Sequence, residues 1–173
     1  TQTVTLVVTN VDEVAPNFTS GTTADAIVEN SGENQVVFTA AAKDTVDFTN
    51  KTVTYALGSD VDTSVFEIDD TSGKVTLIEN PNFETTPNYT FEVVATDATG
   101  NTSTQTVTLA VTNVDDVAPN FTSGTTANAI VENSGENQVV FTAAATDTVD
   151  FTDEKVTYAL GSDVDTSVFE IDD

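Results

Sequence analysis

The sequence predicts an all-β protein made of tandem, seven-stranded Greek-key β-sandwiches. Three observations support this prediction: short segments in which Thr alternates with aliphatic residues, turn-forming residues between these segments, and an internal repeat with a period of 103 residues. No segment shows a 3.6-residue hydrophobic period of useful length, so we expect no long helix.

The repeat divides the chain into three parts. Residues 1–70 align with residues 104–173 without a gap, and seven positions differ: Val7/Ala110, Glu13/Asp116, Asp25/Asn128, Lys43/Thr146, Asn50/Asp153, Lys51/Glu154 and Thr52/Lys155. We expect residues 1–13 to be the last strand and linker of a preceding repeat, residues 14–116 to be one complete repeat, and residues 117–173 to be the N-terminal part of the next. The chain also lacks Met, so we expect it to be an excerpt of a longer array.

Seven short segments of the complete repeat have the length and composition of strands. They are Ala26–Asn30, Gln35–Ala40, Val53–Leu57, Val65–Asp69, Lys74–Glu79, Tyr89–Thr96 and, at 106–114, the copy of Thr3–Val11. Turn-forming residues separate them at Ser31-Gly32, Gly58-Ser59, Ser72-Gly73, Pro81, Pro87 and Gly100. Alternation places Tyr89, Phe91, Val93 and Ala95 on one face of their strand, and Val53, Tyr55 and Leu57 on one face of theirs.

The charge of the chain favours cations as partners. There are 29 acids and four bases, which gives a formal net charge of -25. This charge opposes binding to nucleic acids and to anionic membranes. An acidic surface that only keeps the protein soluble is the alternative interpretation.

The absence of Cys and His excludes disulfides, most zinc and copper sites, and catalysis by Ser-His or Cys-His pairs. A pair of catalytic carboxylates is not excluded by composition. We nevertheless expect no enzyme, because the acids follow another pattern.

Most acids stand at the ends of the predicted strands and in the loops, while strand interiors are nearly free of them. For any single acid, a soluble turn residue is the simpler interpretation. As a set, however, these acids would converge at the two ends of a sandwich, with few bases to offset their repulsion. Calcium, which takes six to eight oxygen ligands, would resolve that repulsion.

Four segments of the complete repeat stand out as motifs. They are "AIVENSGENQVVFTAAAKD" (26–44), "VFEIDDTSGKVTL" (65–77), "FETTPNYTFEVVATD" (83–97) and the linker "VTNVDDVAPNF" (111–121). Their residues, order and spacing resemble those of the cadherin repeat. The resemblance implies calcium bound at the linkers between repeats.

The family's ligand positions can be transferred residue by residue. For the second linker, the resemblance implies Glu29, Glu84, Asn113, Asp115, Asp116, Asp147 and Asp150; for the first, it implies Asn10, Asp12, Glu13, Asp44, Asp47 and Asp97. The linker departs from the family pattern at Asn113, Asp115 and Val117, and Asn82 replaces the first acid of the family's LDxE element. We therefore expect one or two Ca²⁺ ions at each linker rather than three.

These expectations combine into a calcium-stiffened extender within a large, extracellular, bacterial surface protein or adhesin. We expect neighbouring repeats of the same protein as its partners, and a cell-surface or matrix ligand or like chains as further partners. Two alternatives remain open. One is a module that binds a glycan or a like protein chain directly, and the other is a subunit of an extracellular filament.

Overall fold

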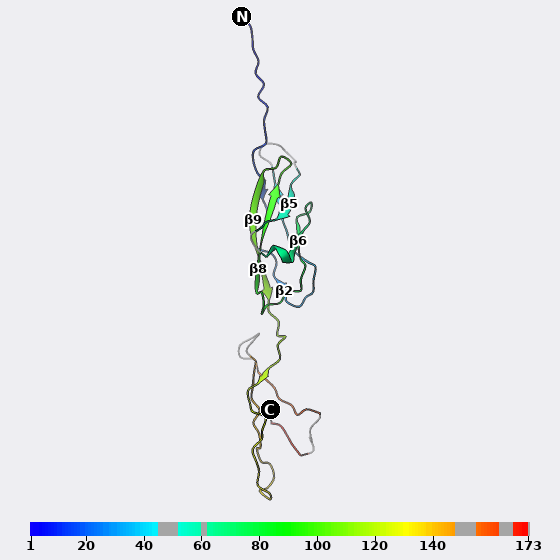
Figure 1. Ribbon diagram of the computed structural model, residues 1–173, viewed down its shortest axis with the longest axis vertical. Helices are drawn as coiled ribbons and strands as arrows, with labels where there is room; N and C mark the ends of the chain where they lie inside the picture. The colour runs from blue at the N-terminus through cyan, green and yellow to red at the C-terminus, as the bar shows by residue number, and fades with distance from the viewer. Residues whose placement is uncertain (45–51, 60–61, 148–154, 163–167, 173) are drawn as a thin grey trace. The chain divides into compact units, whose positions relative to one another are not determined.

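The computed structural model describes residues 1–44, 52–59, 62–147, 155–162 and 168–172, and it separates into two compact units. Unit 1 comprises Thr1–Asn113 and unit 2 comprises Val114–Asp173. Figure 1 shows the ribbon of each unit, in which the described residues form strands and a single short 3₁₀ turn, Thr63–Val65.

Unit 1 is a sandwich of two main sheets. The first sheet has the strand order β2 (Ile27–Val28), β9 (Thr102–Thr112), β8 (Asn88–Thr96) and β5 (Thr54–Leu57). The second has the order β3 (Gln35–Thr39), β7 (Lys74–Leu77) and β6 (Phe66–Ile68), and a small pair joins β1 (Asn17–Phe18) to β4 (Ala42–Lys43). The predicted all-β sandwich is confirmed, and β1 and β4 are strands of unit 1 that the sequence pattern did not predict.

The β8–β9 hairpin supplies much of the core. The two strands pair antiparallel from Asn88↔Ala110 to Thr96↔Thr102, so that alternate residues face the second sheet. The inward residues of β8 (Tyr89, Phe91, Val93 and Ala95) and of β9 (Val107, Leu109 and Val111) are all buried. The predicted buried face of β8 is therefore confirmed.

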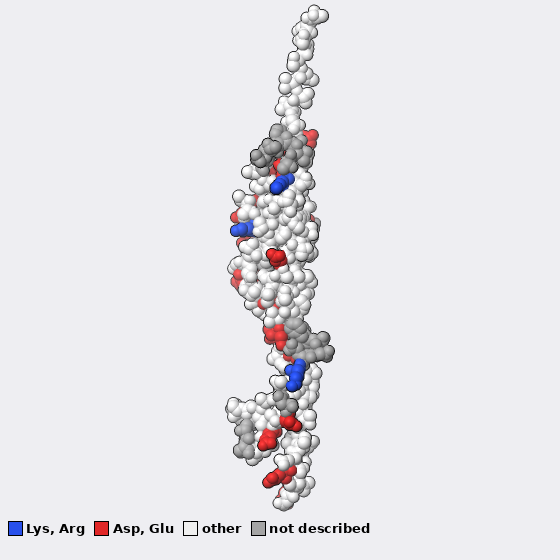
Figure 2. All heavy atoms as spheres, turned by 180° about the vertical axis from the view of Figure 1, so that it is seen from behind, with Lys and Arg blue, Asp and Glu red and all other residues white. Residues whose placement is uncertain are grey.

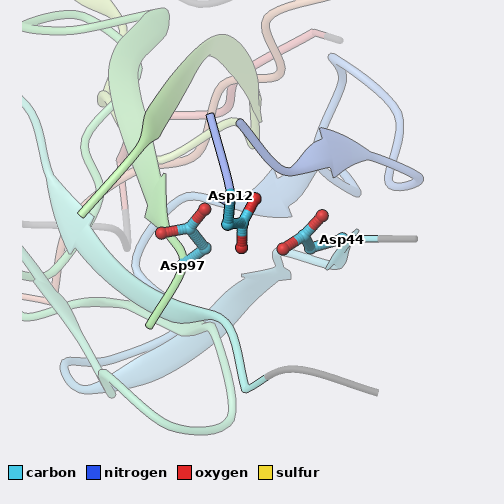
Figure 3. Close-up of side chains that lie close together, drawn as sticks. All are labelled: Asp12, Asp44 and Asp97. Atoms are coloured by element: carbon cyan, nitrogen blue, oxygen red, sulfur yellow. The ribbon is translucent and has the colours of Figure 1, made fainter. Parts of the chain in front are cut away.

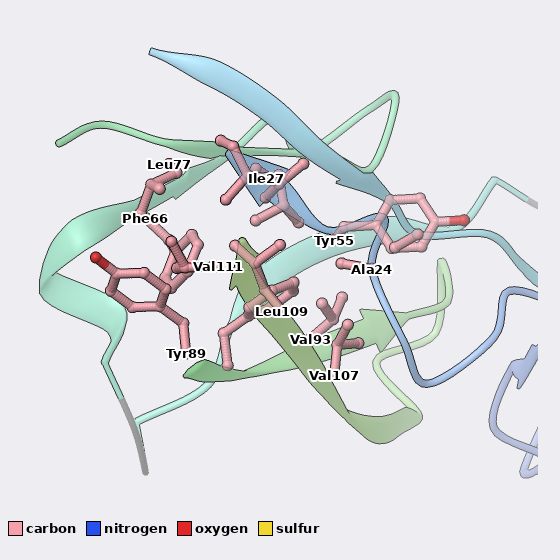
Figure 4. Close-up of a cluster of buried hydrophobic side chains, with 14 of the residues drawn as sticks. Ala24, Ile27, Tyr55, Phe66, Leu77, Tyr89, Val93, Val107, Leu109 and Val111 are labelled. Atoms are coloured by element: carbon pink, nitrogen blue, oxygen red, sulfur yellow. The ribbon is translucent and has the colours of Figure 1, made fainter. Parts of the chain in front are cut away.

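Aromatic side chains connect the two sheets (Figure 4). The ring of Phe91 lies 4.7 Å from that of Phe66 and 5.9 Å from that of Phe38, measured between centroids, and Phe66 also meets Tyr89 edge to face. Such tilted and edge-to-face pairs are favourable beyond the area that they bury. The core therefore sits between β8 on one side and β3 and β6 on the other.

One buried aromatic residue also has a polar partner. The hydroxyl of Tyr89 donates a 2.7 Å hydrogen bond to Oε1 of Glu79. Burial, with this hydrogen bond and the charge of Glu79, raises the pKa of Tyr89 to about 12. The protonated phenol is thus the form that the folded chain stabilises.

The predicted strand Thr3–Val11 does not form. Its residues have no strand structure, and Val4 and Leu6 are 83% and 85% exposed. The copy of this segment lies in β9, where β8 and β2 pair with it on both sides. The first copy differs because no counterpart of β8 precedes it in residues 1–13, and a strand without a partner leaves its backbone polar groups to water.

Unit 2 repeats only part of the sandwich. Its described strands are β10 (Asn120–Phe121) and β11 (Ala145–Thr146), paired as β1 and β4 are in unit 1. Ile130 is 60% exposed, whereas the matching Ile27 is 7% exposed. Residues 117–173 contain no counterpart of β8 and β9, so the predicted strands that repeat β2 and β3 have no sheet to join.

A matched pair of substitutions tests this dependence on context. Phe66 and Phe169 occupy the same position of identical local sequences, but Phe66 is 4% exposed and Phe169 is 49% exposed. We expect Phe66→Ala to lower the free energy of unfolding of unit 1 by about 3–5 kcal/mol, because it leaves a cavity in the core. Phe169→Ala should change it by less than about 0.5 kcal/mol. Urea unfolding followed by tyrosine fluorescence measures both, and equal losses would contradict the described core.

The Tyr89–Glu79 hydrogen bond gives a second prediction. Tyr89→Phe should lower the free energy of unfolding by about 1.5–3 kcal/mol at neutral pH, since the bond is to a charged acceptor. Tyr55→Phe, which removes a hydroxyl that accepts from the backbone N–H of Ala42, serves as the comparison and should cost less.

The same contact predicts an effect of alkaline pH. Because the folded pKa of Tyr89 is raised above its usual 10 to about 12, its contribution is fully present below pH 10 and is lost as the pH rises toward 12. A titration of tyrosine absorbance should show a step near pH 12 that is missing in Tyr89→Phe. A variant that keeps this step would contradict the assignment.

Candidate metal site

Three aspartates from distant parts of the sequence meet at one end of unit 1. Asp12 precedes β1, Asp44 follows β4, and Asp97 follows β8. Each offers a carboxylate oxygen, and these oxygens all lie within 4.8 Å of one another. Figure 3 shows the three side chains lying close together.

The cluster is buried, which makes its charge costly. Asp12, Asp44 and Asp97 are 6%, 4% and 5% exposed. Both carboxylate oxygens of Asp44 are buried without a hydrogen-bond partner among the described residues. A buried carboxylate without hydrogen bonds, beside two more, is strongly unfavourable unless a cation compensates it.

Asp97 differs from Asp44 because the turn after β8 surrounds it with donors. Its Oδ1 accepts hydrogen bonds from the backbone N–H groups of Thr99 (2.8 Å) and Asn101 (2.9 Å) and from the Thr99 hydroxyl (2.9 Å). Burial raises the pKa of Asp97, but hydrogen bonds from Asn101 and Thr99 outweigh burial and hold the pKa well below its usual range. Asp97 is thus fixed in position as an anion.

Asn101 joins two parts of the cluster. Its amide nitrogen donates to Oδ2 of Asp97 (2.8 Å) and to the backbone carbonyl of Asp12 (3.1 Å). The sequence pattern did not single out Asn101 or Thr99 for this role. The run "DATGN" at 97–101 carried a signal, because Asp and Asn in tight turns bond their own backbone.

The arrangement fits a hard divalent cation of the size of Ca²⁺. Oxygens on a sphere of about 2.3–2.6 Å radius around Ca²⁺ are at most about 5 Å apart, and the 4.8 Å limit of this cluster satisfies that condition. Each of the three carboxylates offers at least one oxygen. The chain contains no Cys or His that would favour a softer metal.

Glu29 and Asn113 lie at the opposite end of unit 1. Glu29 is 2% exposed, its backbone N–H donates to the Thr112 carbonyl at the end of β9, and its Oε2 accepts a 2.9 Å bond from the backbone N–H of Phe83. Asn113 follows Thr112 directly, and the exposed Glu84 follows Phe83. The parallel β2–β9 pairing therefore brings Glu29 beside Asn113.

Unit 2 has an acidic depression of its own, defined by Asp115, Asp116, Asp147 and Lys155 together with Val117, Ala118, Pro119, Val156 and Thr157. Within this unit, the linker acids Asp115 and Asp116 and the acid Asp147 line one shallow surface. The residues at the corresponding positions of unit 1 include Asp12 and Asp44, which belong to the aspartate cluster. Figure 2 shows the preponderance of acids over lysines on one face of the molecule.

The remaining predicted ligands are not part of the aspartate cluster. Asn10 and Glu13 are exposed, and Asp47 and Asp150 lie outside the described residues. Of the set predicted for the first linker, the structure brings together Asp12, Asp44 and Asp97. The assignment of all of these residues as ligands remains a prediction.

Comparison with known proteins identifies the family. A model of the cadherin domain matches residues 25–112, which is half of the chain. Protocadherin beta-1 of Homo sapiens is 29% identical over 137 residues, which cover 78% of this chain but only 17% of that protein. The chain therefore belongs to the cadherin family.

Solved structures of cadherin ectodomains share the fold. The structure of Drosophila N-cadherin EC1-4 superposes with a TM-score of 0.61 at 27% identity, covering 76% of this chain and 33% of that chain. Human Protocadherin-24 EC1-2 gives a TM-score of 0.63 at 23% identity, covering 78% and 60%. Cadherin domains are extracellular adhesion modules, not enzymes, and they generally bind Ca²⁺ at the linkers between domains. The described residues contain no helix with the length and apolar character of a membrane span.

The contrast between Asp44 and Asp97 generates a prediction for the metal-free chain. Asp44→Asn should raise the free energy of unfolding in the presence of EDTA by about 1–3 kcal/mol, because it removes a buried charge that lacks hydrogen bonds. Asp97→Asn should lower it, because an amide cannot accept all of the hydrogen bonds that the turn donates.

Asp25→Asn is the matched control, since Asp25 is exposed and the other copy carries Asn128 at this position. Its stability should stay within about 0.5 kcal/mol of the unsubstituted chain. Destabilisation by Asp44→Asn under these conditions would show that the cluster is not strained by its own charge.

Proposed function

We propose that this chain is a calcium-stiffened extender within an extracellular adhesion protein. One observation supports the proposal above the others: three buried aspartates converge at one end of unit 1, and Asp44 has no hydrogen bonds of its own among the described residues. Membership of the cadherin family indicates that the proposed ion is Ca²⁺, since cadherin domains generally bind Ca²⁺ between domains.

The proposed mechanism is electrostatic. Without Ca²⁺, the carboxylates at the end of a repeat and in its linker repel one another, which favours separation of adjacent repeats. When Ca²⁺ is bound, Asp12, Asp44 and Asp97 would coordinate it at one end of the repeat. The linker residues Asn10 and Glu13 would add oxygen ligands, and Asp47 would be a further oxygen ligand. Ligands shared between a repeat and its linker then fix the angle between adjacent repeats.

The second linker would follow the same logic. We propose that Glu29, Glu84 and Asn113 at the end of one repeat act together with Asp115, Asp116, Asp147 and Asp150. Glu29 is already oriented by Phe83, so that it can present a carboxylate without first losing conformational freedom. One or two ions at each linker remain our expectation.

Near-identical repeats favour a function in which the repeats extend the protein, rather than one in which they recognise a ligand. Each added repeat extends such an array without new chemistry. We propose neighbouring repeats of the same protein as the first partners and like chains as a second class. Like chains do associate in one similar structure, that of Protocadherin gammaB7 EC3-6, which is a cis-dimer of that protein.

Calcium removal tests the proposal. Ca²⁺ at about 100 times its dissociation constant should stabilise unit 1 by roughly 2.7 kcal/mol per independent site, and hence raise its Tm by about 10 °C or more. Since extracellular modules bind Ca²⁺ with Kd of about 10⁻⁴–10⁻³ M, the titration should extend to tens of millimolar. Small-angle scattering should report a longer and less variable particle with Ca²⁺ than with EDTA.

The double variant Asp12→Asn/Asp44→Asn should lose the increase in Tm of unit 1, whereas Asp25→Asn should keep it. Mg²⁺ at equal concentration should have a smaller effect, because it demands a stricter octahedral geometry. A Tm and scattering profile that do not respond to Ca²⁺ in the unsubstituted chain would exclude the proposed function.

A further inference from the structure

Three polar side chains at the start of β9 contact the linker segment that leads into unit 1. Asn101 directly precedes β9, and Ser103 and Gln105 lie on the same face of the strand as the buried Val107. All three are half-buried, whereas the intervening Thr104 is exposed. These three residues, the polar ladder, thus precede the apolar part of one face of β9.

Each residue of the polar ladder donates a side-chain hydrogen bond to a backbone carbonyl of the linker segment. The pairs of donor and acceptor are Asn101 with Asp12 (3.1 Å), Ser103 with Pro16 (2.6 Å), and Gln105 with Ser20 and Gly21. Pro16 has no N–H group, so its carbonyl is the backbone group through which a neighbour holds it. Residues 12–21 are therefore attached to β9 along their length by contacts that require no ion.

The second linker indicates that the local sequence does not place these residues by itself. Residues 14–24 and 117–127 are identical, but Pro16 is fully buried whereas Pro119 is exposed. Likewise, Asp12 is 6% exposed, whereas the matching Asp115 is exposed. Residues 117–173 contain no counterpart of β9. The burial of the first linker thus depends on the sandwich that carries the polar ladder.

The polar ladder opposes the repulsion within the aspartate cluster. Without a cation, the carboxylate of Asp12 is repelled by those of Asp44 and Asp97, which favours movement of the linker away from unit 1. Hydrogen bonds to the linker backbone leave the carboxylate of Asp12 unoccupied, so they hold this residue near the cluster without competing with an ion. A ligand that is already in place binds an ion with a smaller loss of conformational freedom.

We propose that the polar ladder is the positioning element of the metal site: it holds the linker on unit 1 in the metal-free chain and presents Asp12 to Ca²⁺. This inference rests on the proposed function, because it assumes that the aspartate cluster binds Ca²⁺. It also places the flexible point between repeats N-terminal to Asp12, since residues 12–21 stay attached whether or not the ion is bound.

The metal-free chain provides the first test. In EDTA, the backbone order parameter of Asp12, measured by NMR relaxation, should be about 0.85, while those of Val4 and Leu6 should be below about 0.6. Ser103 and Pro16 should also show a nuclear Overhauser effect under these conditions. An Asp12 that is disordered in EDTA and ordered with Ca²⁺ would overturn the proposal, because the ion would then position the linker.

Ser103→Ala tests the link to Ca²⁺ affinity, because Ser103 contacts the linker but is not one of the acids of the cluster. Ca²⁺ binding to the full chain is followed through the backbone amide shifts of Asp44 and Asp97. The variant should raise the Kd about two- to tenfold, since the binding position of Asp12 becomes less populated. It should still reach the shifts of the unsubstituted chain at saturation, because the ligands themselves are unchanged.

Two further variants control this result. Ser103→Thr keeps the hydroxyl and should restore the Kd of the unsubstituted chain. Thr104→Ala changes the adjacent residue on the exposed face of β9 and should leave the Kd unchanged. The role of the polar ladder is overturned by no rise in Ser103→Ala, or by a rise of equal size in either control variant.

Failure of this inference is distinguishable from failure of the proposed function. Saturable Ca²⁺ binding at the aspartate cluster, with an Asp12 that is disordered in EDTA, overturns the role of the polar ladder alone. Absence of Ca²⁺ binding at the cluster of the unsubstituted chain overturns the proposed function, and with it the assignment of the polar ladder to a metal site.

Discussion

The β8–β9 hairpin is the element on which the rest of unit 1 depends. Its inward residues form one wall of the core, and its edges pair with β5 on one side and β2 on the other. Its turn carries Asp97 and Asn101, and its far end leads directly to Asn113. Both ends of the repeat are therefore positioned by a single antiparallel pair, whose nine-residue strand β8 separates them by about 30 Å.

Two buried carboxylates of the aspartate cluster, those of Asp97 and Asp44, differ in whether the fold compensates their negative charge. Asp97 is held as an anion by donors from its own turn, so its charge is compensated within the fold. Asp44 is equally buried but has no such donors among the described residues. The burial of the Asp44 carboxylate is therefore electrostatically unfavourable in the metal-free chain, and a Ca²⁺ ion bound at this end of the repeat would offset that cost. A site of this kind makes folding stability and metal binding two aspects of one equilibrium.

The proposed Ca²⁺ sites would give a nearly uniform array a stiffness that depends on the Ca²⁺ concentration. The cores of the repeats need no ion, because apolar residues such as Phe91 and Leu109 hold the two sheets together. The buried aspartates that would bind an ion lie at one end of unit 1, outside this core.

The sequence by itself determined the fold class, the positions of the strands of the complete repeat other than β1 and β4, the family, and the concentration of acids at strand ends. Alternation in Tyr89–Thr96 predicted its buried face because successive strand residues point to opposite sides. The resemblance to the cadherin repeat placed Asp12, Asp44 and Asp97 in one ligand set, and the structure brings these three acids together by strands that pair across long sequence separations. The sequence did not predict the donors of Thr99 and Asn101, which depend on the conformation of one turn.

Tertiary structure alone decided which copies of a segment become strands. Ile27 and Ile130 lie in local sequences that differ only at Asp25/Asn128, yet only Ile27 is buried. Thr3–Val11 and its copy differ at one residue, Val7/Ala110, and only the copy is paired. The physical reason is that a β-strand is not stable alone: its backbone hydrogen bonds and its apolar face are both satisfied by neighbours, and only the complete repeat supplies them.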